Sequence, residues 1–158
     1  MQSKQAFREC AVFDSLSDAD LDKVVSLSQP TELAAGVTLF TEGSPAKDIY
    51  VLEKGKIALQ MQLPQVQPHL TRRITVDVMS KGELVGWSAV VEPYRYTFTA
   101  VCLEPCQLHA VDGAKLRTLL RDDHKVGYVV LSRLIRIVAS RLDETRHVLI
   151  SERLATSQ

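Results

Sequence analysis

The residues that could bind a metal or act as nucleophiles are few and scattered through this 158-residue chain. The three cysteines are Cys10, Cys102 and Cys106. Cys102 and Cys106 are four residues apart, but no second cysteine pair or nearby histidine pair completes a zinc-binding pattern. An odd number of cysteines without a secretory signal is typical of free structural thiols. We therefore expect no metal site.

The four histidines form no catalytic group either. His69 falls in an expected loop, His109 on a late strand, and His124 and His147 on the last expected helix. None has the spacing of a metal ligand, and no nucleophile stands beside a base in the pattern. We assign no catalytic residue and expect that the chain is not an enzyme.

Length and composition indicate one globular domain over residues 1–158. Apolar residues make up 46% and charged residues 24%, which is ordinary for a globular chain. Nineteen basic and nineteen acidic residues cancel, so no net field would attract nucleic acid or an anionic membrane. No apolar run approaches the roughly 18 residues of a spanning helix, and the N-terminus lacks an apolar signal core. We expect a cytoplasmic protein without membrane contact.

The elements that would position a site begin with an N-terminal helical segment over residues 1–30. Ser17 is placed to cap a short helix, and Asp20 is favourable in its first turn. Phe13 and Leu16 precede the cap and can pack back against the helix. This segment is predicted to be structural.

Residues 31–112 change to an apolar period of two. Short β-branched and aromatic runs alternate with glycine, proline and polar turns, which is typical of many short strands. Residues 64–69 hold two prolines and little apolar pattern, so we expect an exposed connection between two strands there. The spacing favours a sandwich or a barrel.

Residues 113–154 are predicted to form two C-terminal helices. Asp112 can cap the first, and the second runs from about residue 123 to 154, which would be on the order of 45 Å long. This helix carries two apolar lines, more than one interface needs. We expect one line to pack on the strands and the other to form a homodimer.

Residues 36–57, GVTLFTEGSPAKDIYVLEKGKI, resemble the first strands of cyclic nucleotide-binding domains. Gly43 and Gly55 mark tight turns in this run, because glycine adopts a positive φ at little energetic cost. The resemblance implies an α+β, mainly β fold. It would be a double-stranded β-helix, or jelly-roll β-roll, with a short N-terminal helix, a short cassette helix and a long C-terminal helix.

A second run, residues 82–97, is similar to the phosphate-binding cassette of that family. There a short helix begins beneath the cyclic phosphate, and its exposed amides carry partial positive charge. Gly86 would let an anion approach the backbone closely. The ligand-binding residues implied by the resemblance are Gly82, Glu83, Leu84, Val85, Gly86, Trp87, Ser88, Ala89, Arg95, Tyr96, Thr97 and Thr145.

Two cassette residues depart from the family pattern. In relatives that bind cyclic AMP or cyclic GMP, a glutamate holds the ribose and an arginine neutralises the phosphate, whereas Trp87 and Tyr96 stand there in this chain. Losing one partner of a buried charge pair costs about 3–5 kcal/mol. The two rings either fill the pocket that holds the nucleotide in those relatives or stack on an aromatic ligand. Arg95 would replace the phosphate contact only from a turn, because adjacent strand residues point to opposite faces.

The last helix extends the resemblance to regulators of the catabolite-activator kind. Arg141, Leu142 and Thr145 match their dimer helix, in which the threonine reaches the base of the nucleotide. The alternative for Thr145 is a solvated or dimer-facing position. Those transcription factors continue into a helix-turn-helix, and this sequence ends after the long helix, so we expect no direct DNA binding.

The sequence thus predicts a non-enzymatic module that senses a small ligand, with altered or lost cyclic AMP and cyclic GMP binding. The sequence assigns no cofactor with certainty; the candidates for a bound ligand are a cyclic nucleotide or another small nucleotide-like or aromatic molecule. Ligand bound near residues 86–89 would reposition the long helix and act on an output protein. The alternative is a ligand-free dimeric interaction module whose pocket is filled by aromatic side chains.

Overall fold

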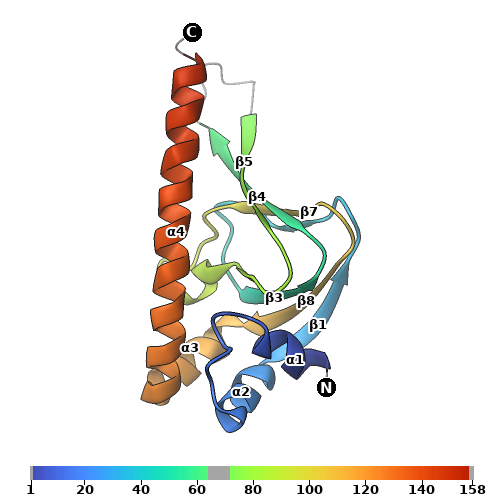
Figure 1. Cartoon of the computed structure of the whole chain (residues 1–158), viewed down its shortest axis with the longest axis vertical. Coiled ribbons are helices and arrows are strands. Elements are labelled where there is room, and N and C mark those ends of the chain that lie inside the picture. The colour runs from blue at the N-terminus through green and yellow to red at the C-terminus, as the bar shows by residue number, and fades with distance from the viewer. Residues whose placement is uncertain (1, 64–71, 157–158) are drawn as a thin grey trace.

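Two four-stranded antiparallel sheets form a β-roll, with helices at its N-terminal and C-terminal ends (Figure 1). The computed structural model describes residues 2–63 and 72–156. The strands are β1 (Ser28–Leu33), β2 (Thr38–Phe40), β3 (Asp48–Lys54), β4 (Ile57–Leu63), β5 (Arg72–Met79), β6 (Leu84–Val85), β7 (Thr99–Cys102) and β8 (Cys106–Asp112). Their order is β1-β8-β3-β6 in one sheet and β2-β7-β4-β5 in the other. The predicted jelly-roll fold is therefore confirmed. The expected connection at residues 64–69 lies outside the described residues.

The core lies between the two sheets because each strand turns its apolar residues inward. Ile49 and Val51 on β3 are fully buried, as are Ile57 on β4 and Val111 on β8. Along β3 and β8, buried residues largely alternate with more exposed ones, which places one face in the core and the other toward solvent, whereas the first three residues of β4 are all buried. The period-two pattern of the sequence is the physical reason for this architecture.

The N-terminal segment holds two helices, α1 (Gln2–Arg8) and α2 (Asp18–Val25), where the sequence indicated one. The predicted cap is confirmed, since the Ser17 hydroxyl accepts a hydrogen bond from the Asp20 amide at 3.2 Å. The seven residues of α1 are too few to form a stable helix alone. Phe7 anchors α1 because its ring is fully buried, with its centroid 5.5 Å from that of Phe13.

The boundary expected at residue 31 lies too late, because β1 begins at Ser28 and contains Pro30. Proline lacks the amide hydrogen that a central strand would donate, so it is tolerated in edge strands. β1 is an edge strand of its sheet, paired only with β8. Pro30 therefore does not interrupt the ladder.

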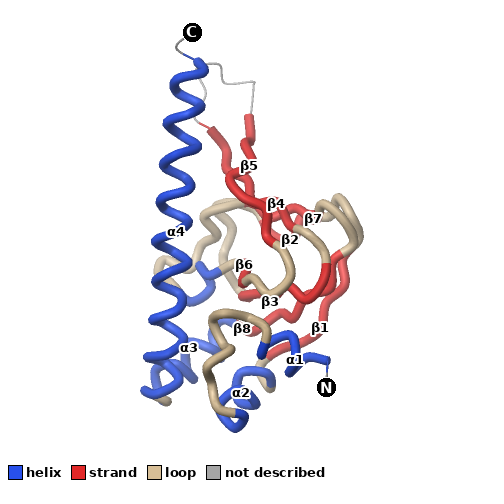
Figure 2. The backbone as a smooth tube through the Cα atoms, viewed as in Figure 1, coloured by secondary structure: helices blue, strands red, loops and turns tan. Residues whose placement is uncertain are grey.

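The C-terminal helices are α3 (Gly113–Asp122) and α4 (His124–Thr156). Asp112 caps α3 as predicted, accepting a hydrogen bond from the Lys115 amide at 3.0 Å. α4 has 33 residues and would be about 50 Å long. It stands beside the roll and extends past it, next to the β4–β5 hairpin (Figures 1 and 2). Within the described part of the chain, no helix has the length and apolar content needed to cross a membrane.

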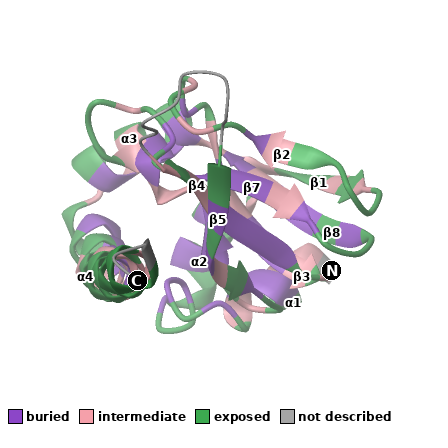
Figure 3. Cartoon of the chain, turned by 90° about the horizontal axis from the view of Figure 1, so that it is seen from above, coloured by how far each residue is buried: buried purple, intermediate pink, exposed green. Residues whose placement is uncertain are grey.

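One side of α4 packs on the domain and the other is open. Val126, Val130 and Leu134 are buried against the rest of the chain. Seen along its axis in Figure 3, α4 stands at the side of the roll, and most of its surface is exposed. The exposed large apolar residues of α4 are Tyr128, Leu131, Ile135, Leu142, Leu149, Ile150 and Leu154.

Candidate functional site

The cassette, residues 82–97, begins with β6 and turns sharply into a single 3-10 turn, η1 (Trp87–Val90). Gly86 makes this turn with φ 87° and ψ 36°, the left-handed conformation that glycine adopts most easily. A Cβ at Gly86 would lie only 3.2 Å from the Tyr96 ring and 3.3 Å from the Asp48 carbonyl oxygen. Glycine is therefore required both by the backbone and by the close packing of the cassette.

The residues before and within η1 are largely engaged by the protein itself. Leu84 and Val85 are buried and pair with β3. The Glu83 carboxylate accepts a hydrogen bond from the Ser80 amide at 2.8 Å. Ser88 and Ala89 are buried, and the Ala89 amide donates to the Gly86 carbonyl oxygen at 3.1 Å. Gly82 lies in the turn before β6, with φ 87°.

Tyr96 fills the interior of the roll next to the cassette. Its hydroxyl donates to the Asp48 carbonyl oxygen at 2.6 Å, and its ring stacks on Phe40. Burial raises the pKa of Tyr96, which keeps its phenol protonated. The cavity left between Tyr96 and the cassette has a volume of about 20 Å³, about enough for one water molecule. Ligand pockets usually measure about 300–1,000 Å³.

Arg95 lies outside this interior. Its side chain is exposed, and Nη1 donates to the Gly43 carbonyl oxygen at 2.8 Å. Arg95 also forms an isolated bridge with Pro45, so it stands in the turn between η1 and β7. In this arrangement its guanidinium supports the neighbouring loop and does not line the small cavity.

A larger cleft opens between the roll and α4 and brings together three of the predicted site residues. Trp87 comes from η1, Thr97 from the segment before β7, and Thr145 from α4. The cleft has a volume of about 310 Å³. Its full lining is Met61, Trp87, Thr97, Phe98, Val138, Arg141, Leu142 and Thr145.

Sequence reasoning did not include Met61, Phe98, Val138, Arg141 or Leu142 among the site residues. Arg141 and Leu142 were part of the match to the dimer helix, and that match is the signal by which they could have been found. Met61 lies on β4 and Phe98 directly precedes β7, and neither residue carries a sign of a ligand contact in the sequence. Their place in the cleft depends on where α4 packs.

Arg141 is the charged residue at the back of the cleft, and its side chain is 10% exposed. Nη1 donates to Asp77 on β5 and to Glu144 on α4, each at 2.5 Å, and Nη2 to the Met79 sulfur at 3.5 Å. Burial raises the pKa of Asp77, but the hydrogen bonds with Arg141, the Val78 amide and Glu144, together with the charge of Arg141, outweigh it, so the pKa of Asp77 is lowered. Burial, together with the neighbouring Asp77, raises the pKa of Glu144.

Arg117 ties the cassette to α3. Its Nη1 donates to the Ala89 carbonyl oxygen at 2.6 Å, and its guanidinium carbon lies 4.0 Å from the centre of the Tyr94 ring. A Cβ added to Gly113, at the start of α3, would lie 3.0 Å from Ala89. Movement of η1 would therefore be transmitted directly to α3.

The three thiols and His109 are buried in the fold. All three cysteines are free and buried, and burial raises the pKa of Cys10 to about 11 and that of Cys102 to about 12. Both thiols are therefore protonated and weakly reactive at neutral pH. His109 is buried, with Nε2 2.8 Å from a Glu53 carboxylate oxygen. Among the described residues no cluster of three or more potential ligands is arranged to hold a metal.

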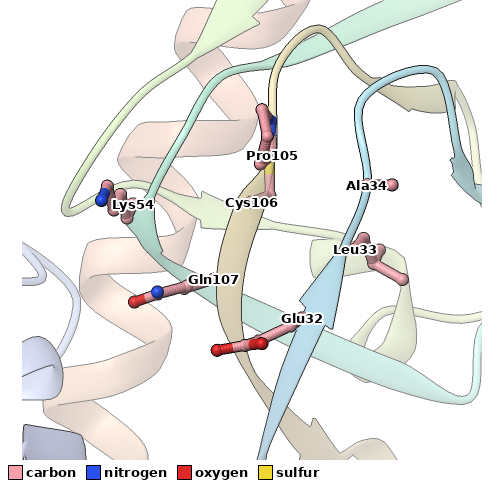
Figure 4. A pocket seen from close by; sticks show the side chains of 7 residues that line it. All are labelled: Glu32, Leu33, Ala34, Lys54, Pro105, Cys106 and Gln107. Carbon is pink, nitrogen blue, oxygen red and sulfur yellow. The ribbon is translucent and has the colours of Figure 1, made fainter.

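Another hollow, of about 300 Å³, lies near the β1 edge of the sheet β1-β8-β3-β6 (Figure 4). Glu32 and Leu33 from β1, Lys54 from β3 and Gln107 from β8 contribute to its lining. β1 and β6 are opposite edges of this sheet, so the hollow is remote from the cassette. It contains none of the predicted site residues.

The β-roll, the cassette and the long C-terminal helix together define a regulatory ligand-binding domain. The family model of the cyclic nucleotide-binding domain matches residues 30–123, and the chain belongs to that family.

Known relatives agree with this assignment. The chain is 22% identical over 136 residues to the CRP-like cAMP-activated global transcriptional regulator of Mycobacterium tuberculosis. The match covers 86% of this chain and 57% of that protein, so the chain spans little more than half the length of its curated relative.

Solved structures show the same fold. A putative cyclic nucleotide-binding protein from Geobacter metallireducens superposes with a TM-score of 0.73 and 25% identity, over 90% of this chain and 99% of that one. A cyclic nucleotide-binding domain from Methylobacillus flagellatus superposes with a TM-score of 0.76 and 18% identity, over 96% and 82% of the two chains.

Proposed function

We propose that this chain is a non-enzymatic regulatory module that senses a small molecule other than cyclic AMP or cyclic GMP. The observation that carries the proposal is the packing of Tyr96 on Phe40, which leaves a cavity of about 20 Å³ beside the cassette. Trp87 also stands where the resemblance implies a ribose-binding glutamate. A cyclic nucleotide would therefore lose both space and charge complementarity, while the cleft beside α4 offers about 310 Å³.

The module is proposed to form a homodimer through α4. Residues recur along α4 at alternating intervals of three and four, the spacing of a coiled-coil seam: Tyr128, Leu131, Ile135, Val138, Leu142, Thr145 and Leu149. Val138 and Thr145 are half-buried, and the other five are exposed and apolar. A seam that repeats every seven residues is complementary to itself about a two-fold axis, so a second copy of this chain is the natural occupant. Leu142 is 70% exposed and Ile135 is 68% exposed, so pairing would remove considerable apolar surface from water.

The output of the module is proposed to be a protein in the cytoplasm, without direct contact with DNA or membrane. Three arginines of α4 already pair with carboxylates: Arg133 with Asp14, Arg141 with Asp77 and Glu144, and Arg146 with Asp143. With three of its arginines paired in this way, α4 presents no continuous basic surface to phosphates.

The melting temperature of the purified chain tests the sensing proposal. It would be followed in the presence of cyclic AMP, cyclic GMP, cyclic dinucleotides, other nucleotides and small aromatic metabolites. A ligand at 100 times its dissociation constant stabilises the folded state by about 2.7 kcal/mol. We expect no saturable shift with cyclic AMP or cyclic GMP and a shift with an uncharged aromatic compound. A saturable shift with a cyclic mononucleotide would refute the proposal.

The second candidate is a ligand-free dimeric interaction module, and the filled cavity beside Tyr96 favours it specifically. Such a module would show no thermal shift with any small molecule while remaining a dimer. Light scattering across a micromolar concentration range measures the dimer independently of any ligand. A monomer at high micromolar concentration would contradict both versions of the dimer.

A further inference from the structure

A polar hollow lies where the start of α1 approaches the sheet β1-β8-β3-β6. Its volume is about 420 Å³, which is larger than that of the cleft beside α4. Ligand pockets usually measure about 300–1,000 Å³, so this hollow has room for a small molecule. The polar residues of its lining are Ser3, Thr31, Glu32, Glu53, Gln107 and His109.

The strand register brings several of these side chains together. Glu32 on β1 is paired with Gln107 on β8, and His109 lies two residues further along β8. Residues two apart on a strand point to the same face, so these three side chains share one face of the sheet. The hollow of Figure 4 adjoins this one and shares Glu32 and Gln107 with it; there the two side chains extend in the same direction from neighbouring strands. The polar hollow is therefore built mainly on the sheet.

His109 holds Glu53 in place beside the hollow. Nε2 of His109 lies 2.8 Å from a Glu53 carboxylate oxygen. Because a carboxylate only accepts hydrogen bonds, we assign the hydrogen to Nε2. The His109 ring is 3% exposed and packs against Phe7 of α1, with 5.7 Å between the ring centroids. The ring is therefore fixed by the packing of α1 on the sheet.

The hollow presents acceptors that call for donors. In a neutral imidazole with its hydrogen on Nε2, Nδ1 is an acceptor. Nδ1 of His109 is buried and has no hydrogen-bond partner among the described residues. The carboxylates of Glu32 and Glu53 are acceptors as well. A molecule that fills the hollow should therefore supply N–H groups.

The charge of the lining selects a cation. Glu32 and Glu53 are both acidic, and no lysine or arginine of the described residues belongs to the lining. Lys54 lines the adjoining hollow and not this one. Two carboxylates in partly desolvated surroundings attract positive charge more strongly than they do in bulk water. No group of three possible ligands in the described chain is arranged to hold a metal ion, so the cation should be organic.

We propose that this hollow binds a small organic cation that bears N–H donors, such as a guanidinium or an ammonium, between the carboxylates of Glu32 and Glu53. His109 is the positioning residue, because it orients Glu53 and offers Nδ1 to an N–H that reaches the ring. The hollow shares no lining residue with the cassette cavity or with the cleft beside α4. The site is therefore independent of the proposed sensing function, and either proposal can fail without the other.

Butylguanidinium is a suitable probe, and butylurea is its matched control, because it has nearly the same shape and N–H groups without the charge. An NMR titration of the isotope-labelled chain follows each backbone amide. We expect saturable shifts of the amides around Glu32 and Gln107, and at least tenfold weaker binding of butylurea. Equal affinities for the two probes, or shifts confined to other parts of the chain, would overturn the proposal.

Two variants test the carboxylates. Glu32→Gln and Glu53→Gln each remove one charge and keep the shape of the side chain, so each should weaken butylguanidinium binding about tenfold. Glu104→Gln, at an exposed acidic residue outside the lining, should leave it unchanged. Glu32 is exposed on an edge strand, so its variant should fold even if Glu53→Gln does not. Unchanged affinity in a folded Glu32→Gln chain would refute the site.

His109→Leu tests the positioning role, because it removes the hydrogen bond to Glu53. The preference for butylguanidinium over butylurea should fall from about tenfold to about threefold. His109→Gln keeps an N–H donor and should keep the preference. A purely structural role would weaken the binding of both probes equally and leave their ratio unchanged in both variants. That result would remove His109 from the site.

Discussion

The ring of Tyr96 lies flat against the ring of Phe40, with 3.7 Å between the ring centroids and 8° between the planes. Phe40 ends β2 and Tyr96 lies near the end of the cassette, so this contact joins two distant parts of the chain across the interior of the roll. Tyr96 also holds the Asp48 carbonyl oxygen at the start of β3. The side chain that replaces the expected arginine is thus part of the core.

Truncating Tyr96 in two steps should separate the contribution of its hydroxyl hydrogen bond to stability from that of its packed ring. Tyr96→Phe keeps the stacked ring and loses the hydrogen bond, so it should cost about 1 kcal/mol of unfolding free energy. Tyr96→Ala also leaves a cavity and should cost about 3–5 kcal/mol. Urea unfolding measures both. Equal stability of the two variants would show that the ring contributes nothing by packing.

Restoring the two charged residues should restore nucleotide binding. We expect the double variant Trp87→Glu with Tyr96→Arg to bind cyclic AMP, because it regains the ribose acceptor, the phosphate cation and the space that the Tyr96 ring occupies. Titration calorimetry should detect saturable heat for the double variant and none for the wild-type chain. The single variant Trp87→Glu is the control, since it lacks the cation. Absence of binding by a folded double variant would contradict this interpretation of the cassette.

Removing Arg117 should loosen the cassette from α3. Arg117→Met loses a charge-assisted hydrogen bond to Ala89 and a cation–π contact with Tyr94, and should cost about 2 kcal/mol. Arg121→Met is the matched control on the same helix, because the Arg121 side chain is 75% exposed. The control should change stability by less than about 0.5 kcal/mol. Similar losses in the two variants would mean that the Arg117 contacts do not stabilise the domain.

Each capping side chain should contribute a measurable amount to the free energy of unfolding. Ser17→Ala and Asp112→Ala each remove a side chain that accepts a backbone hydrogen bond at a helix N-terminus, and each should cost about 1 kcal/mol. Ser140→Ala, at an exposed position of α4, should be within about 0.5 kcal/mol of wild type. Chemical denaturation of the three variants compares them directly. A neutral result at either cap would remove it from the account of the fold.

The contact between β5 and α4 should weaken in acid. The pKa of Asp77 is lowered from its ordinary value of 3.8, so the folded state binds its proton less tightly than the unfolded state. The stability that Asp77 contributes is therefore complete above pH 3.8 and is lost as the pH falls through its lower folded value. Glu144 has a raised pKa and acts in the opposite direction.

Asp77→Asn isolates this contribution of Asp77. The difference in melting temperature between the wild-type chain and Asp77→Asn should be constant near neutral pH and shrink as the pH falls below 3.8. Thermal unfolding across an acidic pH series measures that difference. If it stays constant down to the lowest pH at which both proteins fold, the Arg141–Asp77 pair does not stabilise the ionised carboxylate.

The sequence by itself determined the features that depend on neighbouring residues. Ser17 and Asp112 cap their helices because a capping side chain bonds amides only two or three positions away. The period-two pattern predicted the strands, and the two apolar lines predicted that α4 has a second face. The resemblance located the cassette, with Gly86 at its turn.

Only the tertiary structure decided which distant residues meet. The helix α1 forms because Phe7 is buried against the rest of the fold, which no local signal in seven residues reveals. The Tyr96 ring fills the space beside the cassette because it stacks on Phe40. Arg141 reaches the cleft because α4 packs along β5. Such contacts depend on shape, burial and the pairing of charges across the core, and spacing along the chain does not encode them.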